Sequence, residues 1–232
     1  MATRLQPSPL IGEPPQELTT GDCLTQSEFH AIYERMPEHF RAELIGGVVY
    51  VASPMKLRHG TNHFPLGAVL LAYENATPGT QCADNATAIL NESNEPQPDA
   101  LLRILPEYGG QSATSADDYV QGSPEFVAEI SASSRSIDLG MKRREYAIAG
   151  VKEYLVLDLR DRRLHWFDLE NDEERFPDSD GIYRVKTFPG LWIDSAALLQ
   201  KDFRRLITTL DLGLATPEHA AFVEKLAAAK RS

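Results

Sequence analysis

Two acidic residues stand inside apolar segments that have the pattern of β-strands. Asp99 lies in "QPDALLRI" and Glu129 lies in "FVAEISA". The alternation of a strand puts Asp99 on the face of Leu101 and Glu129 on the face of Val127. Two carboxylates on neighbouring strands repel each other unless a cation or a proton lies between them. Oxygen ligands of this kind suit Mg²⁺ or Mn²⁺, so the pattern predicts a metal site made of Asp99 and Glu129.

A structural interpretation of both acids stays open. Asp99 follows Pro98 and is compatible with a turn at the edge of a strand. Glu129 is compatible with an ion pair to an arginine, because buried charges are commonly paired. Spacing alone does not choose between these ion pairs and a metal site, since structural ion pairs also perturb acids.

The segment "SIDLGMKRREYAIAG" after Glu129 is predicted to be a helix that ends at Gly150. Its predicted apolar stripe consists of Ile137, Met141 and Ile148.

A second stripe, spaced i, i+4, i+8 and i+11, lies beside the apolar one and consists of Asp138, Lys142, Tyr146 and Ala149. If it borders the strand ends, Lys142 can reach a phosphate or the water that attacks it. A lysine in such a cleft contributes little packing, so Lys142→Ala is expected to leave folding nearly intact. The alternative is a solvated lysine paired with Asp138.

Two further groups of residues are candidates for the site. Glu43, in "AELIGG", shares a strand face with Ile45 and Val49 and is compatible with either a metal site or a salt bridge. His59 and His63 have the i, i+4 spacing of zinc-binding helices. No third ligand is apparent in the sequence, and a phosphate contact is the favoured interpretation of the two histidines.

The net charge of −11 argues against a general nucleic-acid coat, because phosphate binding draws on lysine and arginine. A local basic cleft on an acidic body stays possible. Arg143 and Arg144, beside Lys142, are candidates for such a patch, with solvated helix surface as the alternative.

The elements that position these residues alternate along the chain. Periodicity predicts helix, strands, helix, strands, helix, strands and helices, which favours one α/β domain with a mixed sheet. Thr25 and Glu28 have capping-box spacing at the first helix, and Gly46-Gly47 indicate a strand centre or a hairpin turn. The firm part of the next helix is expected to begin near Pro65. The polar segment "EYGGQSATSADDYVQGSP" is expected to be a loop.

Three regions are predicted along the 232 residues: a loose Pro-rich arm over 1–20, a domain over 21–195 and a C-terminal helical extension over 196–232. No apolar run is long enough to span a membrane, and the N-terminus lacks a secretory signal. Cys23 and Cys82 form no metal-like pair and are expected to be reduced thiols, which predicts a cytoplasmic protein.

The motifs together resemble a known family. "QPD" is followed about thirty residues later by "GSPEFVAEISASS" and then by D-x3-K-x3-Y-x3-G-V-x-E-Y-L-V-L-D, from Asp138 to Asp158. This pattern resembles the Uma-two family of restriction-endonuclease-like proteins, assigned to the PD-(D/E)XK nuclease superfamily. "AELIGGVVYVASP" looks like the first strand of that family. The resemblance covers roughly residues 22–195.

The resemblance implies a restriction-endonuclease-like fold, a central mixed β-sheet flanked by helices. It implies a Mg²⁺ or Mn²⁺ site from Asp99 and Glu129, with Glu43 as an additional acid and the Ile130 carbonyl as a third ligand. In most members of the superfamily a lysine lies two residues after the second acid, and this chain has Ser131 there. In the Uma-two family the lysine lies on the following helix, which corresponds to Lys142 in this chain.

The function implied is metal-dependent hydrolysis of phosphodiester bonds, in DNA, by a homodimer that pairs two sites. Retention of two acids and a lysine favours an enzyme. The net charge and the serine in the usual lysine position favour the alternative, a non-catalytic binding or regulatory protein on the same fold.

Overall fold

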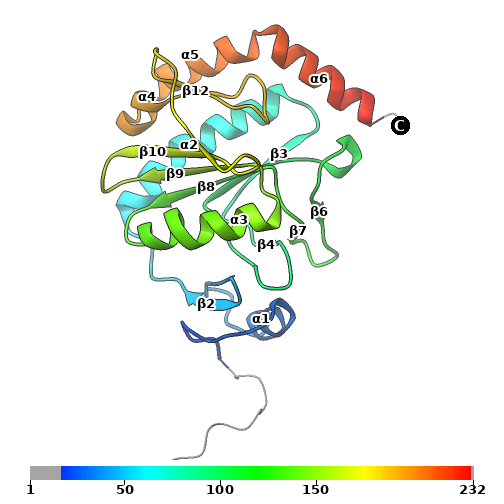
Figure 1. Ribbon diagram of the computed structural model, residues 1–232, viewed down its shortest axis with the longest axis vertical. Coiled ribbons are helices and arrows are strands. Elements are labelled where there is room, and N and C mark those ends of the chain that lie inside the picture. Colours follow the sequence, from blue (N-terminus) through cyan, green and yellow to red (C-terminus); the bar gives the residue numbers. More distant parts are fainter. Residues whose placement is uncertain (1–16, 231–232) are drawn as a thin grey trace, which may run out of the picture.

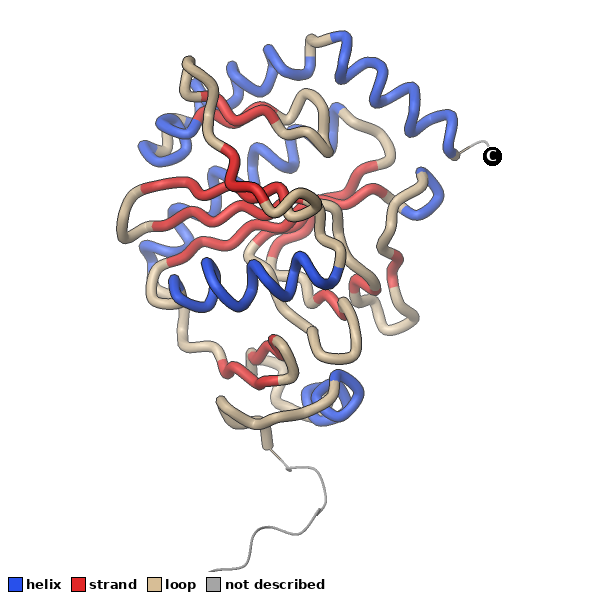
Figure 2. The backbone as a smooth tube through the Cα atoms, in the orientation of Figure 1, coloured by secondary structure: helices blue, strands red, loops and turns tan. Residues whose placement is uncertain are grey.

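A central six-stranded sheet organises the computed structural model, which describes residues 17–230 (Figures 1 and 2). The strand order is β11-β10-β9-β8-β5-β3. Their bounds are β3 (Thr80–Asp84), β5 (Ala100–Ile104), β8 (Phe126–Ser131), β9 (Glu153–Asp158), β10 (Arg163–Asp168) and β11 (Glu173–Arg175). β8 and β9 are parallel and the other pairs are antiparallel, so the sheet is mixed. The predicted mixed α/β architecture is confirmed.

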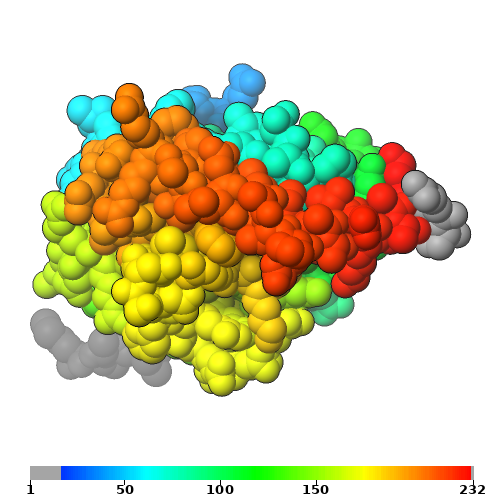
Figure 3. All heavy atoms as spheres, turned by 90° about the horizontal axis from the view of Figure 1, so that it is seen from above, coloured from blue at the N-terminus to red at the C-terminus, as the bar shows by residue number. Residues whose placement is uncertain are grey.

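One face of the sheet is covered by α2 and the three C-terminal helices. These are α2 (Leu57–Ala76), α4 (Ser195–Gln200), α5 (Phe203–Leu214) and α6 (Pro217–Ala229). Seen from above, α5 and α6 run across this side of the molecule from orange to red (Figure 3). They share one hydrophobic core with the sheet, in which Leu66 of α2 and Leu210 of α5 are buried with Phe126 of β8. The hairpin of β12 (Ile182–Arg184) and β13 (Trp192–Asp194) closes this side.

The opposite face of the sheet carries α3 (Arg143–Ala149), which lies below the strands in Figure 1. Tyr146 of α3 is buried there against Tyr154 of β9, with Val127 of β8 in the same cluster. Val127 and Phe126 are neighbours in the chain but belong to different cores, as the period of two in a strand requires. This face is the one that the alternation predicts for Glu129.

A small N-terminal unit of α1 (Gln26–Tyr33) and the hairpin β1 (Ala42–Ile45)–β2 (Val48–Val51) lies beyond α3. The capping box of Thr25 and Glu28 begins α1, as predicted. Gly46 and Gly47 both have positive φ, which the hairpin turn needs and glycine adopts freely. The predicted arm falls mainly on residues 1–16, outside the described residues.

Helix α2 begins earlier than the sequence indicates. It runs from Leu57 and carries Pro65 inside it, whereas the sequence predicts a firm start near that proline. The proline removes one helical hydrogen bond, but the two turns before it are anchored from outside the helix. His59 contacts Asp99, and His63 contacts Asp84.

The helix after β8 buries a different face from the one that the sequence predicts. It opens with a wide π-helical turn, η2 (Ile137–Lys142), before α3, and Gly150 ends it in a left-handed conformation. Ile148, predicted to lie in the apolar stripe, is 67% exposed. The buried face is the polar stripe, with Asp138 and Lys142 both buried. The predicted apolar stripe is therefore wrong: the face turned to the sheet carries Asp138, Lys142 and Tyr146, whose polar groups have buried partners.

Smaller elements complete the described chain. The segment predicted as a polar loop overlaps the 3-10 turn η1 (Pro106–Tyr108) and contains two short strands, β6 (Ala113–Thr114) and β7 (Val120–Gln121). β7 pairs with β6 on one side and with β4 (Ala88–Ile89) on the other. No helix within residues 17–230 combines the length and the apolar character needed to cross a bilayer.

Candidate active site

Asp99 and Glu129 are cross-strand neighbours. β5 pairs with β8 so that Ala100 faces Ala128, and one step further along this register Asp99 faces Glu129. The Oδ2 atom of Asp99 accepts a hydrogen bond from the backbone N–H of Ile130 at 2.6 Å. Both acids are buried, with 8% and 5% of their surface exposed. The pairing of the strands therefore brings the two predicted metal ligands to one place on the sheet.

Lys142 lies between two glutamates. Its Nζ atom is 2.8 Å from Oε1 of Glu129 and 2.8 Å from Oε1 of Glu43. The lysine is only 5% exposed, so the interpretation as a solvated residue paired with Asp138 does not hold. The carboxylate of Asp138 instead accepts a hydrogen bond from Ser134 at 2.5 Å. The partner of Glu129 is therefore this lysine and not an arginine.

Glu43 ties the N-terminal hairpin to the site. It lies on β1, and its Oε1 atom accepts a hydrogen bond from the backbone N–H of Gln97 at 2.7 Å as well as the contact from Lys142. Gln97 precedes Asp99 by two residues, so one carboxylate contacts both the loop before β5 and the helix after β8. The structure thus brings Glu43 together with the other three predicted residues.

Tyr146 supports Glu129 from α3. Its hydroxyl donates to Oε1 of Glu129 at 2.9 Å. Burial raises the pKa of Tyr146 well above its ordinary value, and the charge of Glu129 raises it further, so the hydroxyl remains a donor. Oε1 of Glu129 thus receives both the lysine and the tyrosine, and the acid is held in one orientation.

Four carboxyl groups surround one ammonium at this site. They belong to Glu43, Asp99, Glu129 and Asp138, and the ammonium is that of Lys142. Burial raises the pKa of Glu129 well above its ordinary value, and the other acids raise it further against the opposing charge of the lysine. The cluster therefore holds more acids than its one ammonium can balance, so a proton or a further cation is needed among them. A divalent cation fits such a cluster because it offsets charge that one lysine does not balance.

Asp99 differs from Glu129 in its surroundings. Although burial by itself raises the pKa of Asp99, hydrogen bonds from His59 and from the backbone of Ile130, together with the charge of Lys142, hold it below its ordinary value. Asp99 therefore stays ionised more readily than Glu129, which is what a permanent metal ligand requires.

The chain is similar to known proteins in both sequence and fold. Residues 27–197 match the profile of the Uma2 family, whose description is "Putative restriction endonuclease". The chain belongs to the Uma2 family. The crystal structure of a "putative nuclease belonging to DUF820" from Anabaena variabilis has a similar fold, with a TM-score of 0.57 and 13% sequence identity over 81% of this chain and 99% of that chain. No curated protein matches the sequence.

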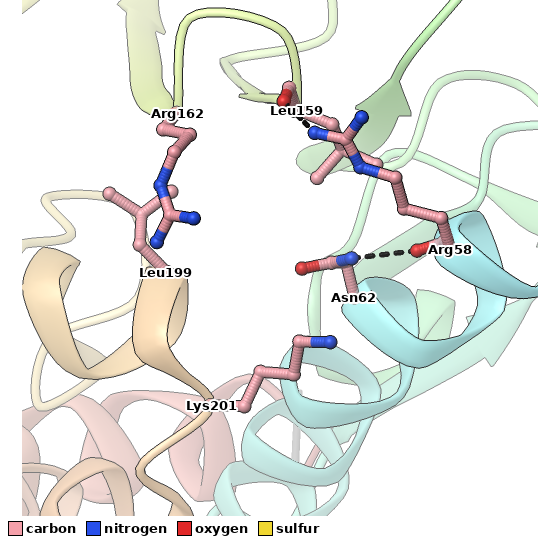
Figure 4. A pocket seen from close by; sticks show the side chains of 6 residues that line it. All are labelled: Arg58, Asn62, Leu159, Arg162, Leu199 and Lys201. Carbon is pink, nitrogen blue, oxygen red and sulfur yellow. Dashed lines mark hydrogen bonds between the residues drawn. The ribbon is translucent and has the colours of Figure 1, made fainter.

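A pocket lined by cationic side chains lies beside the start of α2 in this Uma2 chain (Figure 4). Its volume is about 170 Å³. It is lined by Arg58, Asn62, Leu159, Arg162, Leu199 and Lys201. The cations come from the start of α2, the turn between β9 and β10, and the residue after α4. The guanidinium of Arg58 donates to the carbonyl of Leu159, and Arg58 precedes His59, which contacts Asp99.

The arginines that the sequence suggested for a basic patch are engaged elsewhere. Arg143 pairs with Asp172 at 2.7 Å and lies over the ring of Phe167. Arg144 pairs with Glu145 at 2.8 Å. The cationic pocket is instead built from residues that are distant in the chain. Arg58 lies in the basic segment "MKLRH" and Arg162 in "RDRR", but the sequence does not show that they meet each other and Lys201.

The sequence also does not identify the acid that lies beside His59 and His63. Nε2 of His59 lies 3.1 Å from Oδ2 of Asp99. The hydrogen bond to Asp99 raises the pKa of His59 against the effect of burial. The signal available in the sequence was the i, i+4 spacing of His59 and His63, but only the pairing of β3 and β5 beside α2 shows which acid they meet.

Proposed function

We propose that this Uma2 chain is a Mg²⁺- or Mn²⁺-dependent nuclease that hydrolyses phosphodiester bonds in DNA. The observation that carries the proposal is the buried cluster in which Asp99 and Glu129 face each other across two strands, with Lys142 beside them. An acid pair and a lysine are the groups that metal-assisted phosphodiester hydrolysis uses.

Asp99 and Glu129 would hold the divalent cation, with the Ile130 carbonyl as a further oxygen ligand. The chemistry that a bound cation would supply there is polarisation of the phosphate and a lower pKa of a bound water. The donor set fits Mg²⁺ or Mn²⁺ because its atoms are carboxylate and carbonyl oxygens. The excess of negative charge around Lys142 also favours a divalent ion over an empty acid cluster.

Lys142, at the end of the π-helical turn η2, would contact the phosphate. Its ammonium is held by two carboxylates, so its position is set before substrate binds. Burial lowers the pKa of a lysine, but Glu129, Glu43 and Asp138 outweigh that effect and keep the pKa of Lys142 well above its ordinary value. The residue is therefore a charged donor to the phosphate oxygens or to the attacking water, and not a general base.

The cationic pocket would receive a neighbouring backbone phosphate of the same substrate. Arg162 and Lys201 are exposed, and they line the pocket together with Arg58. Arg58 directly precedes His59, which contacts Asp99. Guanidinium and ammonium groups are the usual phosphate contacts. A local pocket of this kind is what an acidic protein with a net charge of −11 needs in order to bind nucleic acid.

The test is cleavage of plasmid DNA, single-stranded DNA and RNA with Mg²⁺ or Mn²⁺. We expect Glu129→Ala and Lys142→Ala to lose activity, the lysine variant by roughly 10²–10³, the scale for one transition-state charge contact. Glu218→Gln, an exposed acid on α6, is the matched control and should cleave like the wild type. Equal activity in the wild type and Lys142→Ala would contradict the assigned role of the lysine.

DNA binding measured at several salt concentrations tests the pocket separately from cleavage. We expect Arg162→Gln and Lys201→Gln each to reduce the slope of log affinity against log salt by about 1, because each removes one phosphate contact. Lys225→Gln, an exposed lysine on α6, should leave the slope unchanged. Unchanged slopes in all three variants would place the nucleic acid elsewhere.

A non-catalytic binding or regulatory protein on the same fold is the second candidate. The observation that favours it is the double ion pair of Lys142, since a buried lysine between two glutamates also serves as a structural contact. Ser131, in the usual position of the superfamily lysine, also favours a non-catalytic protein. Absence of metal-dependent cleavage on every substrate, in a wild-type protein that still binds DNA, would favour this candidate.

A further inference from the structure

Two histidines of α2 converge on the ends of two strands. Nε2 of His59 is 3.1 Å from Oδ2 of Asp99, and Nε2 of His63 is 2.9 Å from Oδ1 of Asp84. Asp84 ends β3, and it faces Ala100, the residue after Asp99, in the antiparallel pairing of β3 with β5. The helix thus places its first two turns over one corner of the sheet.

The ligand atoms of His59, His63 and Asp99 all lie within 4.8 Å of one another. Bonds from zinc to nitrogen or oxygen are about 2.0–2.2 Å, so ligands of one ion are about 3–3.6 Å apart. The three groups therefore need only small side-chain rotations to share a cation. The carboxylate of Asp84 contacts His63 at 2.9 Å, but it is 75% exposed and is not one of the three converging groups.

The site is mostly shielded from water. His63 and Asp99 are each 8% exposed, and the side chain of His59 is 16% exposed. In the described part of the chain, Nδ1 of His59 is one of four buried side-chain atoms without a hydrogen-bond partner. A half-buried imidazole with unused bonding capacity next to a carboxylate is a suitable metal ligand.

We propose that His59, His63 and Asp99 form a second cation site that takes an imidazole-preferring divalent metal, with Zn²⁺ as its probe. This site differs in chemistry from the Asp99–Glu129 pair, whose oxygen atoms suit Mg²⁺. The two sites share Asp99. The proposal goes beyond the proposed hydrolysis and does not depend on it, because binding of the metal is measured directly and without a substrate.

The experiment is Zn²⁺ titration by calorimetry with four variants. Glu129→Gln removes a ligand of the oxygen site only, and we expect it to bind Zn²⁺ like the wild type. His59→Ala and His63→Ala should each weaken Zn²⁺ binding by at least about 10–100-fold. Loss of a residue that only hydrogen-bonds to a metal ligand already has an effect of that size. His39→Ala, an exposed histidine on the loop after α1, is the matched control and should bind normally.

X-ray absorption of the wild-type protein with one equivalent of Zn²⁺ gives a readout that needs no variant. We expect two imidazole ligands and at least one oxygen ligand. A spectrum with oxygen ligands alone, or Zn²⁺ affinity that falls in Glu129→Gln and is retained in both histidine variants, would overturn the proposal. Loss of nuclease activity alone would not affect it, so its failure and failure of the proposed function are distinguishable.

Discussion

Removal of Lys142 should destabilise the protein strongly. The sequence suggests a lysine at a cleft mouth, whose loss would leave folding nearly intact, but the structure places it at 5% exposure between Glu129 and Glu43. The structure therefore replaces the expectation of intact folding with a predicted loss of stability. Lys142→Met keeps much of the side-chain volume and removes the charge, which leaves two glutamates and Asp138 without their cationic partner.

The magnitude follows from the burial of the ion pair. Removal of one partner of a buried pair costs about 3–5 kcal/mol, because the remaining charge is left without compensation. The side chains of Lys142 and Glu129 are 6% and 7% exposed, so solvent does little to reduce this cost. For a chain of this length each kcal/mol lowers the Tm by about 2–4 °C, which gives a decrease of about 6–20 °C.

The assay is thermal and urea denaturation of Lys142→Met, Glu129→Gln and the double variant in buffer with a chelator. The double variant should be more stable than the sum of the single losses predicts, because the charged partner of the missing lysine is also removed. Lys186→Met, an exposed lysine, is the control and should change stability by no more than about 0.5 kcal/mol.

Two results would refute this reasoning. A Lys142→Met variant with the Tm of the wild type would show that the buried ion pair contributes nothing to folding. Strict additivity in the double variant would show that Lys142 and Glu129 are not coupled in spite of the 2.8 Å contact. Added Mg²⁺ should restore part of the stability of Lys142→Met, since a cation at Asp99 and Glu129 supplies positive charge.

Three further predictions concern other parts of the molecule. Glu153 is buried and accepts hydrogen bonds from Nε1 of Trp166 at 2.8 Å and from the backbone N–H of Thr187 at 2.6 Å. Glu153→Ala leaves both donors unpaired, so it should lower the free energy of unfolding by about 2–6 kcal/mol in urea denaturation. A loss below about 1 kcal/mol would contradict this. Burial raises the pKa of the Cys82 thiol to about 12, so this thiol stays protonated at pH 8. Iodoacetamide at pH 8 should therefore modify the exposed Cys23 and leave Cys82 unmodified, as mass spectrometry can determine. Rapid alkylation of both cysteines would contradict this. The homodimer predicted from the sequence should give a dimer mass in light scattering at micromolar concentration, and monomer alone would count against it.

The fold and the identity of the acids could be predicted from local signals. The capping box of Thr25 and Glu28 begins α1, and the glycine pair turns the first hairpin, because both depend on residues close in the chain. The period of two correctly places Glu129 on the face of Val127. The resemblance of the motifs to the Uma-two family agrees with the family match and with the fold that was found.

The tertiary structure alone decided how the acids are paired. The contact of Lys142 with Glu43 joins residues 99 positions apart, and that of His59 with Asp99 spans 40 positions. The helix after β8 buries its polar stripe and leaves Ile148 in solvent, because Lys142 and Tyr146 meet their partner Glu129 only when the helix packs on the sheet. Periodicity reports the face on which a side chain lies within its own element. Which charge that side chain meets depends on how distant strands and helices pack, and that packing decides whether a buried carboxylate is balanced by a lysine, a histidine or a cation.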